Sequence, residues 1–362
     1  MSSQPILAYV GAAAPNGNGI YLFRLNPADG VLTPVKLAAA INSPSWLDIH
    51  PNGGILYAVD EASGSVMAFS IDRTNGELTP LGAAVSSQGA GPAHLSVDPL
   101  GQFVFVANYE GGSIAVLPIR EDGSVGDASD VHIDTQPVGP ANAASAPPGS
   151  FAISGHDAAH PHQIQADPAG KFVIHTDLGE DRIYSWLLNR GAGKLTLNAV
   201  TPVPPGDGPR HFAFHPNGAW LYSLQEEGST LIFFTYTAAT GTLTEQQQIS
   251  TLPPDFAGTS FTSEVRVSAD GNFVYAANRL HDTIAVLRVD AHSGRLTRVG
   301  EASTEGDYPR NFTIDPTGNY LFCCNQRSDA ITTFRIRERG AVLDFTGRYT
   351  AVGSPAVIVF LT

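Results

Sequence analysis

The sequence repeats one pattern of short strands along its whole length, and this repeat limits the fold more than any other feature. A strand of alternating apolar residues followed by a Gly-Xaa-Leu-Thr-like turn occurs seven times, from NGIYLFRLNPADGVLTPV (18–35) to AITTFRIRERGAVLDFT (330–346). Between these copies lies a strand pair with a Pro-Xaa-Gly-like turn, and HPNG (50–53) is the first of six such turns. The spacing of these turns is 47–53 residues, apart from one interval of 69 (168 − 99). Repeats of about 40–50 residues with four short strands are typical of β-propeller blades.

The seventh copy of the second unit is split between the two ends of the chain. Gly353-Ser354-Pro355 and the following AVIVFL match the strand before each turn, and PILAYVG (5–11) matches the strand after it. A strand from each end would then share one blade, which closes the ring and removes the free sheet edges. The sequence therefore predicts an all-β, seven-bladed β-propeller of four-stranded antiparallel blades, with one blade closed by both termini. We expect residues 1–362 to form a single domain.

Composition narrows the range of partners. The net charge is 20 − 34 = −14, which disfavours nucleic acids and anionic membranes. The N-terminal MSSQPILAYVG has no basic segment and no long apolar run, so we expect a cytoplasmic protein without a membrane span.

Cys323 and Cys324 are neighbours in a predicted strand, where consecutive side chains point to opposite faces, so we expect two small core residues and no disulfide.

Aligning the blades on their turns separates the core positions from positions that vary between blades. In the predicted innermost strand, the third position after the starting proline is apolar in all seven copies. The two positions before it differ from blade to blade. The first reads Ser45, Ala93, His162, Arg210, Ser263, Arg310 and Ala356, and the second reads Trp46, His94, Gln163, His211, Glu264, Asn311 and Val357.

The end of the second strand gives two further aligned positions. The earlier one is nearly uniform, and we expect it to cap the turn that follows: Asp60, Asn108, Asp177, Gln225, Asn278, Asn325 and Gly11. The later one is variable: Glu61, Tyr109, Leu178, Glu226, Arg279, Gln326 and Ala12. The two strands are antiparallel, so the start of one lies beside the end of the other. All the variable positions are therefore predicted to surround one end of the central channel, which we call the mouth.

A long segment between two of the blades is also expected at the mouth. Residues of about 121–160 account for the interval of 69, and the part VGPANAASAPPGSFAISGHDAAHPHQ is rich in Ala, Gly, Pro and Ser. Such a composition gives little core, so we expect a loop that crosses the opening.

The polar residues at the mouth gather on four consecutive blades. Several guanidinium groups in a chain of charge −14 suit an anionic substrate or a developing oxyanion, and His162 and Glu226 are the groups suited to proton transfer. Each of these side chains taken alone could instead bind channel water or satisfy backbone groups. His160-Pro161-His162, with His156, could hold a metal ion, but neighbouring arginines would repel it, so we expect no metal.

Four segments resemble the seven-bladed propeller lactonase family: HPHQIQADPAGKFVIHTDLGEDRIYSW, GPRHFAFHPNGAWLYSLQEEGST, SEVRVSADGNFVYAANRLHDTIAVL and PRNFTIDPTGNYLFCCNQRSD. That family contains the propeller type of bacterial 6-phosphogluconolactonase and the fungal carboxy-cis,cis-muconate lactonizing enzymes. The resemblance implies a catalytic group of His162, Arg210, Glu226 and Arg279, which the blade alignment also selects. The chain departs from the family pattern at Gln225, where Asn is usual, and at Pro161, where a small residue is common.

These observations predict an intracellular, metal-independent lactonase without a cofactor that hydrolyses a small anionic sugar-acid lactone. The residues expected to bind the substrate are His160, His211, Glu264, Arg310, Asn311, Gln326 and Tyr109. The alternatives are a muconate-type lactonizing cycloisomerase and a propeller scaffold that binds a protein partner. The sequence leaves open which lactone is used, whether it is phosphorylated, whether His162 or Glu226 is the base, and the oligomeric state.

Overall fold

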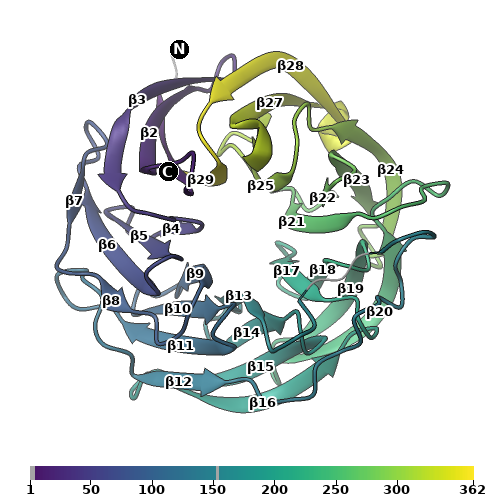
Figure 1. Ribbon diagram of the computed structural model, residues 1–362, viewed down its shortest axis with the longest axis horizontal. Coiled ribbons are helices and arrows are strands. Elements are labelled where there is room, and N and C mark those ends of the chain that lie inside the picture. The colour runs from purple at the N-terminus through teal and green to yellow at the C-terminus, as the bar shows by residue number, and fades with distance from the viewer. Residues whose placement is uncertain (1–4, 152–154) are drawn as a thin grey trace.

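The chain folds into a ring of β-sheets around a central opening (Figure 1). The computed structural model describes residues 5–151 and 155–362. Within these ranges there are seven sheets, and neighbouring strands in each sheet are antiparallel. Each sheet has one edge strand, its innermost strand, beside the opening. The predicted seven-bladed, all-β propeller is confirmed. None of the helices in these ranges is long and apolar enough to cross a membrane.

Blade 1 joins the two ends of the chain, as the split repeat predicts. Its strands, from the channel outward, are β29 (Pro355–Phe360), β1 (Ile6–Ala12), β2 (Gly19–Asn26) and β3 (Val31–Ala40). Strands β1 and β29 pair from Ala8 opposite Phe360 to Ala12 opposite Pro355. Gly11 is required here because a Cβ atom at this position would lie 2.2 Å from the carbonyl oxygen of Pro44 in the next blade.

The other six blades follow in chain order, and in blade 2 two short strands take the place of the outermost one. Blade 2 comprises β4 (Leu47–Ile49), β5 (Ile55–Asp60), β6 (Ser65–Ile71), β7 (Leu78–Pro80) and β8 (Val85–Ser86). Blade 3 comprises β9 (Pro92–Val97), β10 (Phe103–Asn108), β11 (Ser113–Pro118) and β12 (Asp130–Ile133). Blade 4 comprises β13 (Pro161–Ala166), β14 (Phe172–Asp177), β15 (Arg182–Asn189) and β16 (Lys194–Pro202).

The remaining blades complete the ring beside blade 1. Blade 5 comprises β17 (Pro209–Phe214), β18 (Trp220–Gln225), β19 (Thr230–Thr237) and β20 (Thr242–Ser250). Blade 6 comprises β21 (Phe261–Val267), β22 (Phe273–Arg279), β23 (Thr283–Val289) and β24 (Leu296–Ser303). Blade 7 comprises β25 (Pro309–Ile314), β26 (Tyr320–Asn325), β27 (Ala330–Arg337) and β28 (Val342–Ala351), with the short 3-10 helices η1 (Gln326–Ser328) and η2 (Glu338–Gly340).

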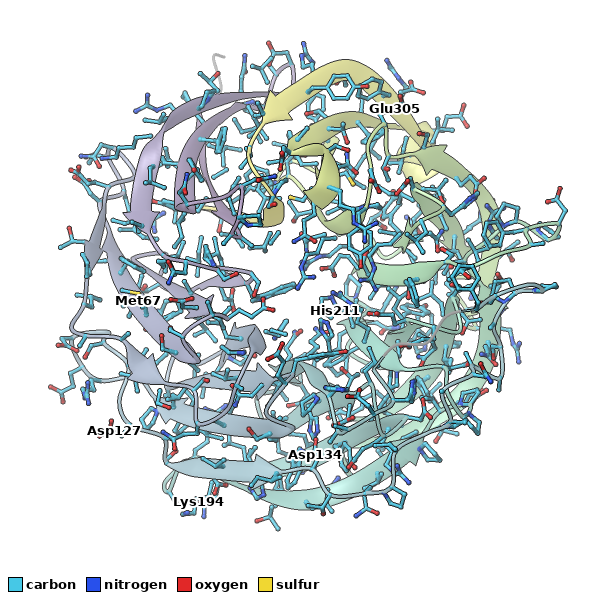
Figure 2. All side chains as sticks on the ribbon, viewed as in Figure 1. Met67, Asp127, Asp134, Lys194, His211 and Glu305 are labelled. Atoms are coloured by element: carbon cyan, nitrogen blue, oxygen red, sulfur yellow. The ribbon has the colours of Figure 1, made fainter. Side chains whose placement is uncertain are left out.

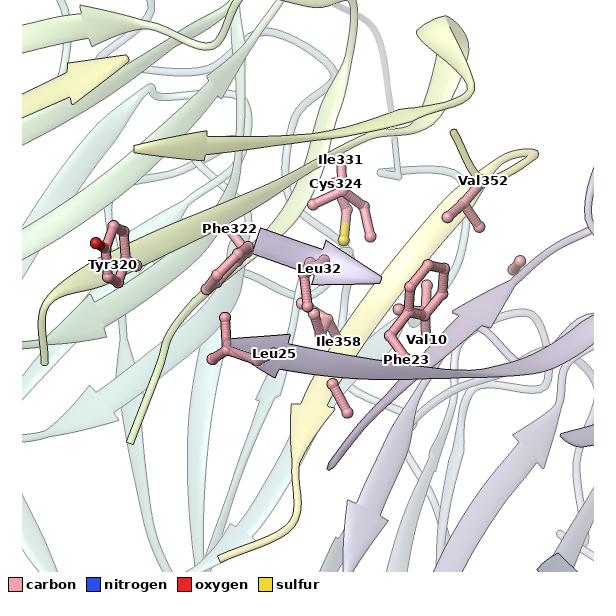
Figure 3. Packing of buried hydrophobic residues seen from close by; sticks show 12 residues of the cluster. Val10, Phe23, Leu25, Leu32, Tyr320, Phe322, Cys324, Ile331, Val352 and Ile358 are labelled. Carbon is pink, nitrogen blue, oxygen red and sulfur yellow. The ribbon is translucent and has the colours of Figure 1, made fainter. Parts of the chain in front are cut away.

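The hydrophobic core is divided among the contacts between neighbouring blades. Over the described ranges, the buried residues form seven clusters, one at each blade-to-blade contact. Figure 3 shows the cluster between blades 7 and 1, where Phe322 and Cys324 pack with Phe23 and Ile358. Cys323 belongs to the cluster on the opposite face of blade 7, and both thiols are free and buried, as predicted. Each blade is therefore stabilised mainly by its two neighbours.

The nearly uniform position at the end of the second strand connects strands more widely than a turn cap does. In three blades its asparagine amide donates to a backbone carbonyl in the connection that follows the outermost strand of the preceding blade. The same amide also donates to a hydroxyl within the first three residues of the third strand. These sets are Asn108 with Ser87 and Ser113, Asn278 with Thr251 and Thr283, and Asn325 with Thr304 and Thr332. The predicted local cap is present at Asp177, whose Oδ1 accepts the backbone amide of Glu180 over 2.8 Å, but in these three blades the position connects more distant strands.

Candidate active site at the mouth

Every innermost strand carries one extra residue near its start. In blade 5, Pro209 is opposite Gln225 and Phe212 is opposite Ser223, so three steps on β17 match two on β18. The other innermost strands of the described chain show the same irregularity. Such a β-bulge re-aims side chains and is frequent beside active sites. Here two consecutive residues, such as Arg210 and His211, both face the channel.

The first variable position of the blades surrounds one small cavity. The cavity has a volume of about 10 Å³, and His211 lies beside the central opening in Figure 2. It is lined by Ser45, Trp46, Ala93, His162, Arg210, His211, Arg310 and Ala356. Six of these eight residues come from the first variable position, so the structure brings them to one place at the mouth.

Glu226 joins two arginines from neighbouring blades. Its Oε2 atom lies 2.8 Å from Nε of Arg210 and 2.7 Å from Nη2 of Arg279, and all three residues are buried. Burial raises the pKa of Glu226, but the charges of Arg279 and Arg210 outweigh it and hold the pKa below its usual value. Burial and the neighbouring Arg279 lower the pKa of Arg210 to about 10. At neutral pH the group is therefore one carboxylate between two guanidinium ions.

Arg279 is held by residues that the blade alignment did not select. Its Nη1 donates to the hydroxyl of Tyr308 over 3.1 Å, and its Nη2 donates to the carbonyl oxygen of Thr262 over 2.8 Å. The guanidinium carbon also lies 5.7 Å from the ring centre of Phe261. Tyr308 and Phe261 directly precede the aligned positions of their strands, so extending the alignment by one residue would have found both.

His162 is buried beside the arginines and keeps one ring nitrogen without a partner. Its ring lies 4.9 Å from that of His211 and 5.5 Å from that of Tyr109, measured between centres. Its Nδ1 atom is buried and has no hydrogen-bond partner. Burial lowers the pKa of His162 well below its usual value, and the charge of Arg210 lowers it further. The imidazole is therefore neutral at pH 7 and able to accept a proton.

The second variable position forms a floor beneath the mouth. Nδ1 of His211 lies 3.4 Å from Oε2 of Glu264, and the amide of Asn311 donates to the same oxygen. The rings of Trp46 and His94, from the neighbouring blades 2 and 3, are tilted by 38° with their centres 4.2 Å apart. Glu264 lines a larger cavity of about 430 Å³ on the other side of this floor, not the cavity at the mouth. Glu264 and Asn311 thus support the floor and do not border the small cavity.

The other predicted binding residues lie around the mouth at different depths. His160 stacks on Tyr109 at 4.2 Å, and its Nδ1 lies 2.8 Å from the carbonyl oxygen of Tyr109. Arg310 lines the cavity, and its Nη2 lies 4.0 Å from a carboxylate oxygen of Glu61. Gln326 begins η1 and contributes its backbone amide to the carbonyl oxygen of Tyr308, away from the cavity lining.

The long connection before blade 4 is shorter than predicted and follows the neighbouring blades. It covers 134–160, because residues 130–133 form β12 and residues 121–129 belong to the turn between β11 and β12. Residues 152–154 of the predicted loop lie outside the described residues. Three of its backbone amides form hydrogen bonds to the neighbouring blades. The amide of Gly139 donates to the carbonyl oxygen of Gly179 in blade 4, that of Ser145 to the carboxylate of Asp207 beside blade 5, and that of Phe151 to the hydroxyl of Thr259 before blade 6.

Comparison with known proteins points to one family. The sequence model described as "Lactonase, 7-bladed beta-propeller" matches residues 7–360. The chain is 36% identical over 358 residues to a protein of Bacillus subtilis (strain 168) named 6-phosphogluconolactonase, with 98% of each chain covered. It is 30% identical over 330 residues to a 6-phosphogluconolactonase of Formosa agariphila, with 88% of each covered. Among solved structures, the periplasmic gluconolactonase of Pseudomonas aeruginosa is similar with a TM-score of 0.89 and 28% identity, and 99% of each chain is covered.

Proposed function

Because this chain belongs to the family of seven-bladed β-propeller lactonases, we propose that it hydrolyses an anionic sugar-acid lactone at the mouth of the propeller. One observation carries the proposal: Glu226 holds two arginines beside a buried, neutral imidazole that has a free nitrogen. The arginines supply positive charge where an oxyanion would develop, and the imidazole supplies a proton acceptor. The names of two relatives make 6-phosphogluconolactone the first substrate to test.

In the proposed reaction, a water molecule attacks the carbonyl carbon of the lactone while His162 accepts one of its protons. Arg210 and Arg279 stabilise the negative charge that forms on the carbonyl oxygen. When the tetrahedral intermediate collapses, the bond between the carbonyl carbon and the ring oxygen breaks. The proton on His162 then passes to the ring oxygen, which becomes a hydroxyl group of the product. The open product is a hydroxy acid.

The geometry favours His162 over Glu226 as the base. The Oε2 atom of Glu226 is engaged by two guanidinium groups, whereas Nδ1 of His162 has no hydrogen-bond partner and is free to accept a proton. In the proposal, Glu226 therefore positions the arginines, and His162 carries the proton. No metal ion takes part in the proposed reaction. Metal independence and a cytoplasmic location stay predictions.

The purified protein should release acid from a sugar-acid lactone faster than the lactone hydrolyses on its own. We would follow acid release in a pH-stat with 6-phosphogluconolactone and gluconolactone, and ultraviolet loss with 3-carboxymuconate. A preference for the phosphorylated lactone is expected from the arginines at the mouth. Activity on the diene alone would identify a cycloisomerase, and activity on none of these compounds would favour a binding scaffold.

Arg279→Ala and Arg210→Ala should each lower kcat/KM on the best lactone by about a hundredfold or more, since each removes a donor that stabilises the oxyanion. Arg288→Ala is the matched control, because Arg288 is exposed on β23 away from the mouth. Breaking one of these buried ion pairs can also cost about 3–5 kcal/mol of stability, so circular dichroism and thermal unfolding accompany the kinetics. Folded variants with wild-type kcat/KM would show that these arginines do not act in the reaction.

A further inference from the structure

Three acidic side chains meet where blade 3 joins blade 4. Asp134 follows β12, Asp177 ends β14, and Glu180 lies in the turn before β15. Each places one carboxylate oxygen within 4.8 Å of the others. Asp177 is 0% exposed and Glu180 is 1% exposed, while Asp134 exposes 4% of its side chain. The three carboxyl groups, which we call the acidic site, share one buried space away from the opening that His211 borders (Figure 2).

Two oxygens of the acidic site are buried without a partner. Oδ2 of Asp177 and Oε1 of Glu180 have no hydrogen bond. Among the described residues, no lysine or arginine forms an ion pair with any of the three carboxylates within 4.0 Å. The guanidinium of Arg182 donates instead to the backbone carbonyls of Pro137 and Glu180. Burying negative charge without compensation is costly, so these carboxyl groups either share protons or hold a positive ligand between them.

The equivalent places in other blades show what is missing here. Asp134 is the blade 3 equivalent of Ser87, Thr251 and Thr304 in blades 2, 5 and 6. In all four blades the backbone amide of this residue donates to the carbonyl oxygen of the residue one position before the third strand. An asparagine amide bridges to that place in blades 2, 5 and 6. Here the asparagine is replaced by Asp177, which has no N–H group to donate. The other blades thus have an amide that donates to a backbone carbonyl at this place, whereas here the carboxyl groups of Asp134 and Asp177 lie within 4.8 Å of one another.

The surrounding side chains keep the carboxylates as acceptors. Nε1 of Trp186 donates to Nδ1 of His175 over 2.8 Å, so this nitrogen carries no proton in the bond. The other nitrogen, Nε2, therefore carries the proton and donates to Oδ2 of Asp134 over 2.9 Å. The hydroxyl of Tyr184 donates to Oε2 of Glu180. Such support orients carboxylate ligands around a metal ion.

We propose that the acidic site binds a calcium ion, which fastens both ends of the connection 134–160 to blade 4. The ligands are all oxygens, and Ca²⁺ binds oxygen at about 2.3–2.6 Å, so it can bridge oxygens up to about 5 Å apart. Asp134 begins the connection, and Oδ1 of Asp177 accepts the amide of His160 at its other end over 3.0 Å. The ion anchors the segment next to His162 and takes no part in the proposed hydrolysis.

The test uses Tb³⁺, which binds at calcium sites and emits light when a nearby aromatic ring is excited. Tyr184 contacts Glu180 directly, and Trp186 contacts Asp134 through His175, so both can sensitise a bound ion. Chelator-treated full-length protein should show sensitised emission that saturates at about one Tb³⁺ per chain. Ca²⁺ should displace the Tb³⁺ at a lower concentration than Mg²⁺ does. The melting temperature should also rise with Ca²⁺, because the ion binds only the folded state.

Asp134→Asn and Glu180→Gln should each reduce the sensitised emission about tenfold or more and remove the calcium-dependent rise in melting temperature. Asp127→Asn is the matched control, because Asp127 is exposed in the same blade and lies outside the acidic site. Circular dichroism establishes that each variant is folded. Emission unchanged in both folded variants, displacement by Mg²⁺ before Ca²⁺, or absence of emission and of a melting shift in the wild type would overturn the proposal. In the last case the carboxyl groups share protons instead.

Discussion

Replacing His162 with glutamine should lower kcat on the best lactone by about a hundredfold to ten-thousandfold, because the imidazole is the proposed proton acceptor. Glutamine keeps a similar size and polarity but cannot take up the proton. His162 lies beside the arginines with a buried and unpartnered Nδ1, which is the free acceptor that the reaction needs. The fold should persist, because the residue lies at the start of β13 and outside the seven hydrophobic clusters.

His292→Gln is the matched control, since His292 is exposed in a turn of blade 6. The measurement is kcat from initial rates of acid release, with thermal unfolding in parallel. Glu226→Gln is measured beside His162→Gln and His292→Gln. Loss of the negative charge should disturb the two arginines, so this variant should show a higher KM as well as a lower kcat. If folded His162→Gln turns over as fast as the wild type, the proton acceptor is another group.

The pH dependence of activity gives a second test of His162 as the proton acceptor. The pKa of His162 lies well below its ordinary value of 6.5, so the base is deprotonated at neutral pH. Activity should stay constant as the pH falls to 6.5 and decline only below it, when the imidazole takes up a proton. Arg310 is one of the charges that lower this pKa, so Arg310→Ala should move the decline to higher pH. If the decline in activity occurs at the same pH in folded Arg310→Ala as in the wild type, the decline does not report protonation of His162.

Removing residues 355–362 should abolish cooperative folding of the whole propeller. The deletion takes away β29, which pairs with β1 and packs on blades 7 and 2 through Ile358 and Val357. Ile358, Val357 and Leu361 are 1%, 1% and 9% exposed. Burying each such side chain contributes about 1.5–3 kcal/mol, so the three together approach the total stability of about 5–15 kcal/mol of a typical protein. The loss also reopens a sheet edge on β1.

The measurement is thermal and urea unfolding of the truncated chain beside the full-length protein. Ile358→Ala provides an intermediate case with an expected loss of about 2–5 kcal/mol. Thr362→Ala is the control, because its side chain is exposed at the end of the chain. A truncated chain that unfolds in one transition near the melting temperature of the full-length protein would show that the ring does not need its closing strand.

The sequence by itself determined the blades and the position of the mouth. The repeated sequence pattern identifies which strands are equivalent between blades. In the innermost strands, the third position after the start is apolar in all blades and marks the buried face, as Leu95 and Phe312 illustrate. The split repeat revealed the pairing of β29 with β1, because a ring has one place left for the two ends. Positions that vary between otherwise equal repeats have no shared structural task, and His162, Arg210 and Arg310 do converge on one cavity.

Only the tertiary structure decided how these residues meet. Strict alternation would turn Arg210 and His211 to opposite faces, and the β-bulge at the start of β17 brings both to the channel. The same packing places Glu226 between two arginines and sends Glu264 to the other side of the floor. The contacts of Arg279 with Glu226 and of His211 with Glu264 join different blades, and a repeat pattern records the order of residues within a blade but not the distances between blades. The meeting of Asp134 with Asp177 arises in the same way, from two blades whose sequences look ordinary when read one at a time.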